Sequence, residues 1–280
     1  MARTALVNLG DGLGGRMVAG KGDIILWIHG YTLNSECWSS LWDQLPGYRH
    51  IGIDLPGHGI SLPLPASETM TALAGRLGRV ARDQGARHLV ALSFGAIIAL
   101  QMALEHPGAV ETLVLGSPLL GGGPFEPELW RRYKELKAMF RDRGSGPHLS
   151  ESWMAPDSAL FRGTDRYPRV WDGIRRQVRR HPWWELADDS YYDLWHQPQA
   201  SSALRAVAAA TLVLGGRDDG AAARQCSALL GRLLPACRQH ELPDLGHLGL
   251  LEGTAHVLPL MREHWLANNG PQTGGPHACD

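Results

Sequence analysis

The sequence predicts an α/β fold in which a mostly parallel sheet is flanked by helices and a helical cap is inserted into the chain. Two observations favour this class. Up to Ser117-Pro118, short and almost wholly apolar runs alternate with stretches of helical apolar spacing, a pattern typical of parallel strands buried on both faces. The alternation then stops, and it resumes at Thr211. A helical segment therefore interrupts the α/β core.

Each strand is predicted from an apolar run bounded by glycine, proline or polar residues. In chain order the predicted strands cover residues 23–28, 50–53, 88–92, 112–115, 211–214 and 239–242. The helices between them are predicted where apolar residues recur at helical spacing, over residues 38–45, 67–84, 94–106, 221–234 and 254–266. The glycine-rich segment Gly10–Gly15 is predicted as a hairpin turn.

Residues 1–118 and 207–268 are thus assigned to the α/β core, and residues 119–206 to the cap. Helices are predicted in the cap over residues 126–140, 171–180 and 201–207. The cap also holds six of the ten tryptophans. The last residues, 269–280, are polar and rich in glycine and proline, which predicts a flexible tail.

Charge and composition exclude several classes of protein. Lysine plus arginine (27) almost balances aspartate plus glutamate (28), so nothing favours binding to nucleic acid or to a membrane surface. The apolar runs are too short to cross a bilayer, and the N-terminus lacks the pattern of a signal peptide. The four cysteines have no CxxC spacing and no HExxH pattern occurs. We therefore expect a cytoplasmic protein with reduced thiols, no metal, no cofactor and a small-molecule substrate as its partner, with the oligomeric state left open.

The segment Ala91-Leu-Ser93-Phe-Gly95 lies where a predicted strand turns directly into a predicted helix. A serine between small residues in that setting is typical of a nucleophile elbow, because the tight turn exposes its hydroxyl above the sheet. Ala91 stands where a glycine is more usual. Taken alone, the serine would equally suit the N-cap of the following helix.

Two further candidates follow later strands. Asp219 ends the turn after the strand 211–214, and His247 follows the strand 239–242. Ligands of open α/β sheets bind at the carboxyl ends of the strands. The chain order of serine, aspartate and histidine also matches one known arrangement of a catalytic triad. The three residues together therefore predict nucleophilic catalysis.

The turn His29-Gly30-Tyr31, after the first predicted strand, completes this set. A glycine there allows the backbone N–H of Tyr31 to point to the space above Ser93. Together with the N–H of Phe94, it would form an oxyanion hole, the usual stabiliser of a tetrahedral intermediate.

These segments together resemble the α/β-hydrolase superfamily, over most of the chain outside the cap. The matching motifs are His29-Gly30, Asp54-Leu-Pro-Gly-His-Gly-Ile-Ser61, Leu92-Ser-Phe-Gly95, Gly216-Arg-Asp-Asp219 and Gly246-His247 with Glu252. In that family's G-x-x-D turn the fourth residue is the catalytic acid, so the resemblance selects Asp219. The family's hydrophobic residue and proline after the acid are replaced here by Gly220-Ala-Ala-Ala223, which leaves Asp218 as the alternative.

The predicted activity is that of a serine hydrolase acting through an acyl-enzyme on Ser93. Its substrate would be an ester, lactone or thioester of a medium-sized apolar or aromatic molecule, because aromatic cap residues suit such a pocket. The cap tryptophans assigned to substrate binding are Trp130, Trp153, Trp183 and Trp184.

Three alternatives stay open. The first is a hydrolase of carbon–carbon bonds in ring-fission dienoates, for which polar residues of the cap, such as its arginines, would bind the carboxylates. The second is a lyase or cyclase on the same fold, and the third is a catalytically inactive binding protein.

Overall fold

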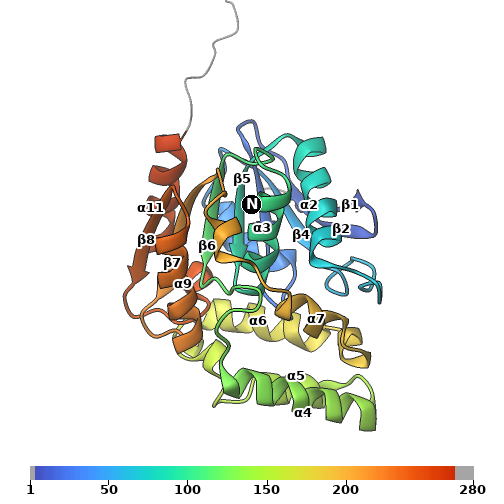
Figure 1. Ribbon diagram of the computed structural model, residues 1–280. Coiled ribbons are helices and arrows are strands. Elements are labelled where there is room, and N and C mark those ends of the chain that lie inside the picture. The colour runs from blue at the N-terminus through green and yellow to red at the C-terminus, as the bar shows by residue number, and fades with distance from the viewer. Residues whose placement is uncertain (1–3, 269–280) are drawn as a thin grey trace, which may run out of the picture.

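Eight strands form one sheet in the order β1-β2-β4-β3-β5-β6-β7-β8 (Figure 1). The computed structural model describes residues 4–268. From β4 to β8 along this order, neighbouring strands run parallel, whereas β1 and β2 are antiparallel additions at one edge. The predicted α/β class with a mostly parallel sheet is therefore confirmed. The strands are β1 (Thr4–Gly10), β2 (Leu13–Val18), β3 (Ile24–Ile28), β4 (Arg49–Asp54), β5 (Ala86–Leu92), β6 (Thr112–Gly116), β7 (Ala210–Gly216) and β8 (Cys237–Leu242).

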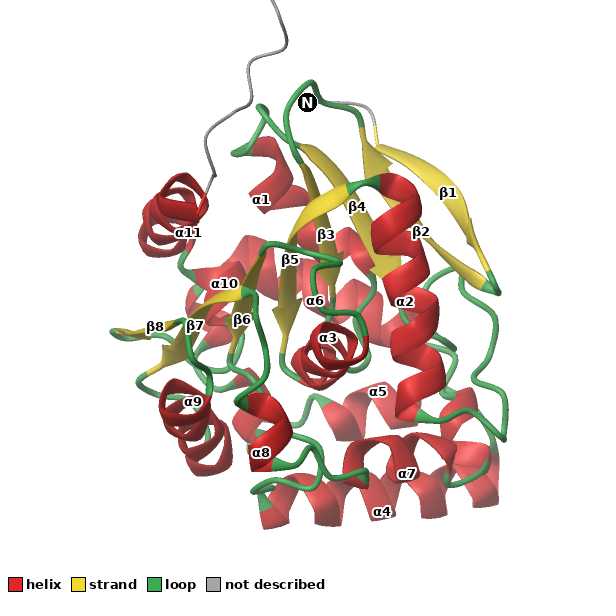
Figure 2. Cartoon of the chain, turned by 45° about the horizontal axis from the view of Figure 1, so that its top comes forward, coloured by secondary structure: helices red, strands yellow, loops and turns green. Residues whose placement is uncertain are grey.

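Helices cover both faces of the sheet. Figure 2 shows α2 (Met70–Gln84), α3 (Phe94–Glu105) and α9 (Ala221–Leu233) on one face, with α1 (Ser39–Asp43) and α11 (Thr254–Asn268) on the other. Nine of the twelve residues of α3 are buried, because this helix packs against the sheet, α2 and the cap. Such burial fixes the start of α3, the point at which Ser93 lies. Two shorter helices, η1 (Ser35–Trp38) and α10 (Gly249–Glu252), follow β3 and β8.

Between β6 and β7 the described chain forms helices and no strand. These helices lie together beyond the carboxyl ends of the parallel strands (Figure 2). They are α4 (Pro127–Arg143), α5 (Pro147–Trp153), η2 (Ala159–Phe161), η3 (Thr164–Arg166), α6 (Pro168–Arg180), η4 (Trp184–Ala187), α7 (Ser190–His196) and α8 (Ser201–Leu204). Sequence patterns predict α4, α6 and a longer α8, but they miss α5 and α7. Each missed helix has seven residues, which is too short for a clear helical period.

The hairpin of β1 and β2 was not predicted as strands, although the turn between them is confirmed by the antiparallel pairing. Most of β1 is exposed, including Leu6 at 62%. A strand without a buried face has no alternation of apolar and polar residues to detect. Within residues 4–268, no helix combines the length and the apolar character needed to span a bilayer. The tail predicted for residues 269–280 lies outside the described residues.

Candidate active site

Ser93 occupies a strained turn between β5 and α3. Its backbone has φ +56° and ψ −118°, a combination that residues with a side chain rarely adopt and that costs about 1–3 kcal/mol. The Ser93 N–H donates to the carbonyl oxygen of Gly116 on β6 at 2.9 Å, which anchors the turn. The serine side chain makes no capping hydrogen bond to α3. Ser93 is thus the N-cap residue of α3 by position, but its side chain does not cap the helix.

Close packing of α3 against the neighbouring loop requires the glycine of this turn. A Cβ on Gly95 would lie 2.6 Å from the carbonyl oxygen of His29 and 2.8 Å from that of Ile28. Such contacts are shorter than van der Waals packing allows. Ala91, at the other small position, lies fully buried within β5, so the elbow forms with alanine in place of glycine.

The turns after β5, β7 and β8 bring three polar side chains into one hydrogen-bonded chain. His247 Nε2 lies 2.7 Å from Ser93 Oγ, and His247 Nδ1 lies 2.9 Å from Asp219 Oδ1. With a neutral imidazole, Nδ1–H donates to the carboxylate and Nε2 accepts from the serine hydroxyl. This is the arrangement in which an imidazole can take the serine proton while the carboxylate stabilises the imidazolium.

Burial and charge act in opposite directions on the two ionisable members of this chain. Burial raises the pKa of Asp219, but the charge and hydrogen bond of His247 outweigh it, so the pKa lies below the usual range. Burial lowers the pKa of His247, but the charge and hydrogen bond of Asp219 outweigh it, so the pKa lies above 6.5. Asp219 is therefore ionised at neutral pH.

The structure distinguishes the two adjacent aspartates of the acid turn. Asp219 is 3% exposed, and its Oδ1 also accepts from the N–H of Gly220 at 2.6 Å. Asp218 points to the surface, where its side chain is 45% exposed and lies 3.7 Å from Arg166. Only Asp219 is bonded to His247, as the family resemblance implies.

The turn after β3 lies directly against the elbow. A Cβ on Gly30 would lie 3.4 Å from Ser93 Cβ, so a side chain at this position would come into van der Waals contact with the serine. The N–H of Phe94 begins α3 and has no partner inside the helix. Among residues 4–268, neither this N–H nor that of Tyr31 donates a hydrogen bond. Both donors therefore remain available.

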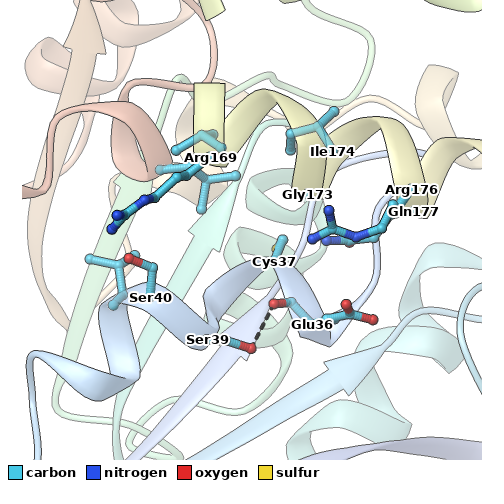
Figure 3. A pocket seen from close by; sticks show the side chains of 12 residues that line it. Glu36, Cys37, Ser39, Ser40, Arg169, Gly173, Ile174, Arg176 and Gln177 are labelled. Atoms are coloured by element: carbon cyan, nitrogen blue, oxygen red, sulfur yellow. Dashed lines mark hydrogen bonds between the residues drawn. The ribbon is translucent and has the colours of Figure 1, made fainter. Parts of the chain in front are cut away.

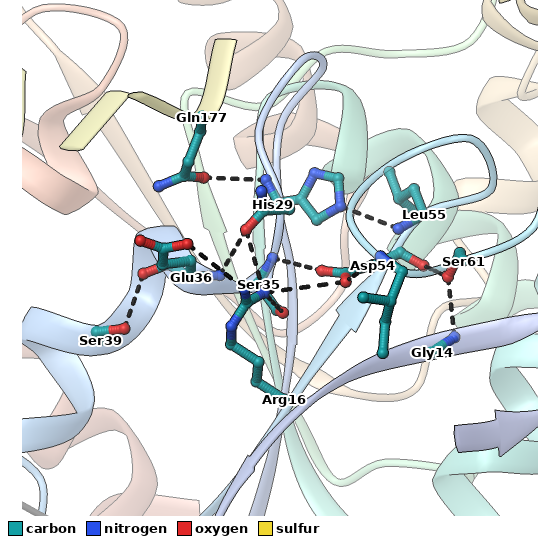
Figure 4. Close-up of polar contacts among 12 residues, drawn as sticks. Gly14, Arg16, His29, Ser35, Glu36, Ser39, Asp54, Leu55, Ser61 and Gln177 are labelled. Atoms are coloured by element: carbon teal, nitrogen blue, oxygen red, sulfur yellow. Dashed lines mark hydrogen bonds and ion pairs between the residues drawn. The ribbon is translucent and has the colours of Figure 1, made fainter. Parts of the chain in front are cut away.

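A buried polar network braces the same turn from the core side (Figure 4). Asp54 accepts from the N–H of Ser35 at 2.7 Å and from that of Ile60 at 2.9 Å. His29 Nε2 accepts from the N–H of Leu55 at 2.9 Å. Burial lowers the pKa of His29 to about 4, which keeps the ring neutral and able to accept. The proline- and glycine-rich loop after β4 thus acts as a structural support.

A small cavity of about 20 Å³ adjoins the triad. That volume is close to the space of one water molecule, and Ser93 is only 7% exposed. The cap therefore closes the site in this structure. Apart from Glu126, Asp219, Gly220 and His247, its lining is apolar and consists of Leu119, Phe125, Leu129, Ala159, Leu160, Ala222 and Ala223.

None of the tryptophans assigned to substrate binding lines this cavity. Trp153 is fully enclosed, and its ring centroid lies 5.3 Å from that of Tyr31. Trp183 is also buried and packs on His181 with ring centroids 4.8 Å apart. Trp130 stacks on other cap aromatics, and Trp184 lies 51% exposed on the surface. The structure thus brings only Trp153 against the turn beside Ser93.

Several cap residues near the site were not singled out from the sequence. They lie around the ring of Tyr31 and are Tyr133, Glu185, Tyr191 and Trp195. Their chain separation from Tyr31 exceeds 100 residues, so no local pattern connects them with it. The only signal in the sequence was the aromatic content of the cap.

A second hollow of about 230 Å³ lies between η1, α1 and α6 (Figure 3). Its walls include Glu36, Cys37, Arg169 and Arg176, and Figure 3 shows both arginine side chains reaching over it. No member of the triad lines this hollow. It is therefore separate from the cavity beside His247.

Comparison with known proteins agrees with this geometry. A sequence profile described as alpha/beta hydrolase family matches residues 25–257. Over 255 residues the chain is 28% identical to a 2-succinyl-6-hydroxy-2,4-cyclohexadiene-1-carboxylate synthase of Enterobacter sp. (strain 638), covering 88% of this chain and 93% of that protein. Over 113 residues it is 37% identical to a pimeloyl-[acyl-carrier protein] methyl ester esterase of Methylococcus capsulatus, covering 39% of this chain and 43% of the esterase. The first four relatives are matched over between 28% and 44% of their length.

A similar solved structure is that of a thermophilic esterase from Thermogutta terrifontis. The two share a TM-score of 0.74 with 24% sequence identity, covering 95% of this chain and 98% of the esterase. At that identity the likeness shows a common fold.

Proposed function

Since this chain belongs to the alpha/beta hydrolase family, we propose that it is a serine hydrolase whose nucleophile is Ser93, activated by His247 and Asp219. The observation that carries this proposal is the hydrogen-bonded chain of the three side chains at a strained elbow. A helix cap or a structural serine would not require a positive φ together with a buried imidazole and an ionised carboxylate. An activated nucleophile at a tight elbow accounts for all three.

The proposed reaction has two stages. Ser93 Oγ attacks the carbonyl carbon while His247 Nε2 takes the hydroxyl proton, and the N–H groups of Tyr31 and Phe94 bind the developing oxyanion. His247 then returns the proton to the leaving group, which leaves an acyl-enzyme. Water, deprotonated by the same histidine, releases the acid and restores the serine.

We propose an ester, lactone or thioester of a medium-sized, largely apolar acid as the substrate. The lining of the cavity beside His247 supports this, because it is mostly leucine, alanine and phenylalanine. The Methylococcus relative, named a methyl ester esterase, is consistent with ester chemistry. The closed cavity requires the cap to move before such a substrate can enter.

Dienoate cleavage has less support from the cap. Arg175, Arg176, Arg179 and Arg180 are all exposed on α6. The cap side chain bonded to Tyr31 is Glu185, a buried acid, which would repel a carboxylate substrate. A non-hydrolytic reaction on the same fold is the second candidate, because the Enterobacter synthase is matched over 93% of its length.

Intact-mass spectrometry after incubation with a fluorophosphonate tests the proposal. We expect one adduct on the wild type and none on Ser93→Ala. Ser227→Ala is the matched control, since Ser227 is also a buried serine, 3% exposed on α9, and it should label fully. A folded wild type without an adduct, which also hydrolyses no ester, would contradict the mechanism and favour the non-hydrolytic and binding alternatives.

A further inference from the structure

The turn formed by residues 29–32, here called the oxyanion loop, is held in a conformation that it would not adopt alone. Thr32 has φ +64°, which for a β-branched residue is a genuine outlier of the left-handed region. Such a backbone persists only where surrounding contacts impose it. The preceding residue, Tyr31, carries one of the two N–H groups assigned to the oxyanion.

Two of the contacts that hold this loop come from the cap. The Tyr31 hydroxyl donates to Glu185 Oε1 at 2.6 Å, and the indole N–H of Trp153 donates to Thr32 Oγ1 at 3.0 Å. The core holds the same loop through His29 Nε2, which accepts from the Leu55 N–H, and through the Thr32 N–H, which donates to His58 Nε2 at 3.2 Å. Consecutive residues of the oxyanion loop are therefore tied to η4 and to the end of α5.

Glu185 is a buried carboxylate that is held in place by His181 and accepts a hydrogen bond from Tyr31. It is 5% exposed, and its Oε1 also lies 2.8 Å from His181 Nε2. Burial raises the pKa of Glu185, but His181 and the Tyr31 hydroxyl outweigh it and bring it below the usual range. Burial and the charge of Glu185 raise the pKa of Tyr31 well above 10, so its hydroxyl keeps its proton. The contact is therefore a charge-assisted hydrogen bond, which is stronger than one between neutral groups.

We propose that Glu185 and Trp153 are positioning residues that set the oxyanion loop for catalysis, so that the oxyanion hole is complete only while the cap is closed. The inference rests on the proposed function. Substrate entry requires the cap to lift from Ser93. That movement separates Glu185 and Trp153 from Tyr31 and Thr32 and frees the strained loop to relax. Hydrolysis is then confined to a substrate over which the cap has closed.

The alternative is that these bonds only join the cap to the core. The two roles differ in what they change. Loss of a bond that only joins the cap to the core lowers the free energy of unfolding. A misplaced oxyanion donor instead lowers kcat and weakens the binding of tetrahedral adducts, with little change in KM. Removal of a whole oxyanion donor in other hydrolases costs about 10²–10³ in rate, so displacement of one should cost about tenfold or more.

The variants Trp153→Phe and Glu185→Gln separate these roles. Glu185→Gln keeps the shape of the side chain and removes its charge, whereas Trp153→Phe keeps an aromatic ring and removes the indole N–H. The matched control is Gln197→Met. Gln197 also joins cap to core, accepting from the N–H of Met70 at 2.9 Å, but it does not touch the oxyanion loop. For each variant we would measure Tm, kcat and KM with a p-nitrophenyl ester, and the Ki of a matching trifluoromethyl ketone, whose hemiketal oxygen occupies the oxyanion hole.

We expect kcat to fall about tenfold or more in both variants, the Ki of the ketone to rise by the same factor, and KM to stay within twofold. Gln197→Met should leave all three kinetic values unchanged, even where Tm falls. In a Thr32→Gly background, where φ +64° carries no strain, Trp153→Phe should have no further effect on kcat.

Variants in which only Tm falls, with kcat and Ki unchanged, would overturn the positioning role while leaving the serine mechanism intact. A wild type that neither hydrolyses the ester nor binds the ketone would overturn the proposed function, and this inference with it.

Discussion

Replacement of Asp219 by asparagine tests the electrostatics of the triad. Its Oδ1 lies 2.9 Å from His247 Nδ1, and both side chains are at most 5% exposed. Two unit charges about 4 Å apart attract by about 4 kcal/mol at an effective dielectric constant of about 20. In resting enzyme whose His247 is neutral, the imidazolium forms only during the reaction, so the loss falls on the transition state. At 1.36 kcal/mol per tenfold, about 4 kcal/mol corresponds to a loss of about 10³ in kcat.

The matched control is Asp218→Asn. Its carboxylate is exposed beside Arg166 and does not contact His247. We expect kcat to stay within about threefold, because exposed ion pairs contribute at most about 1 kcal/mol. Steady-state hydrolysis of one ester by both variants at pH 8, with Tm recorded for each, gives the comparison. A large loss for Asp218→Asn with near-normal Asp219→Asn would refute the assignment of the acid.

The pH dependence of kcat/KM in the same two variants tests the direction in which Asp219 shifts the pKa of His247. His247 must be neutral to accept the serine proton, so kcat/KM of the wild type should rise with an apparent pKa above 6.5, the direction that Asp219 imposes. Burial, the largest influence on this pKa, acts downward. In Asp219→Asn the rise should therefore move below 6.5, whereas in Asp218→Asn it should stay in place. A rise that does not move in Asp219→Asn would contradict the role of this carboxylate.

Three further predictions follow from burial. Burial lowers the pKa of His50 to about 4. The contribution of this neutral side chain to the free energy of unfolding is therefore fully present above the unfolded pKa of about 6.5, and about 3 kcal/mol of it is lost as pH falls towards 4. Urea unfolding of the wild type should show this loss, and His50→Gln should lack it. Trp183→Ala should cost about 3–5 kcal/mol, whereas exposed Trp184→Ala should change stability by less than about 0.5 kcal/mol and leave KM unchanged; equal effects on Tm would contradict this. Leu160→Ala should enlarge the cavity beside His247 and raise the kcat/KM ratio of longer to shorter esters about tenfold; an unchanged ratio would place the acyl group elsewhere.

The parallel part of the sheet was predictable from local patterns, and so was the position of the three proposed triad residues at the ends of its strands. Strands buried on both faces show as continuous apolar runs, and β3 to β8 all begin and end within two residues of their predictions. The serine, the aspartate and the histidine each follow such a strand. Parallel strands present their carboxyl ends at one edge, so strand positions alone place these residues near one another.

The exposed hairpin and the short cap helices had no comparable signal. β1 buries no face, and α5 and α7 are too short for a helical period. Hydrophobic periodicity reports burial along one element, and it fails where that burial is absent or the element is brief.

The sequence by itself determined which residues could carry the chemistry, because each sits in a turn whose conformation depends on its immediate neighbours. The tertiary structure alone decided which cap residues reach the site. Trp153 and Glu185 are 121 and 154 residues away from their partners in the oxyanion loop, while Trp184 in the same segment faces solvent. Which face of a cap helix meets the core depends on how all the helices pack together, and no run of neighbouring residues encodes that choice.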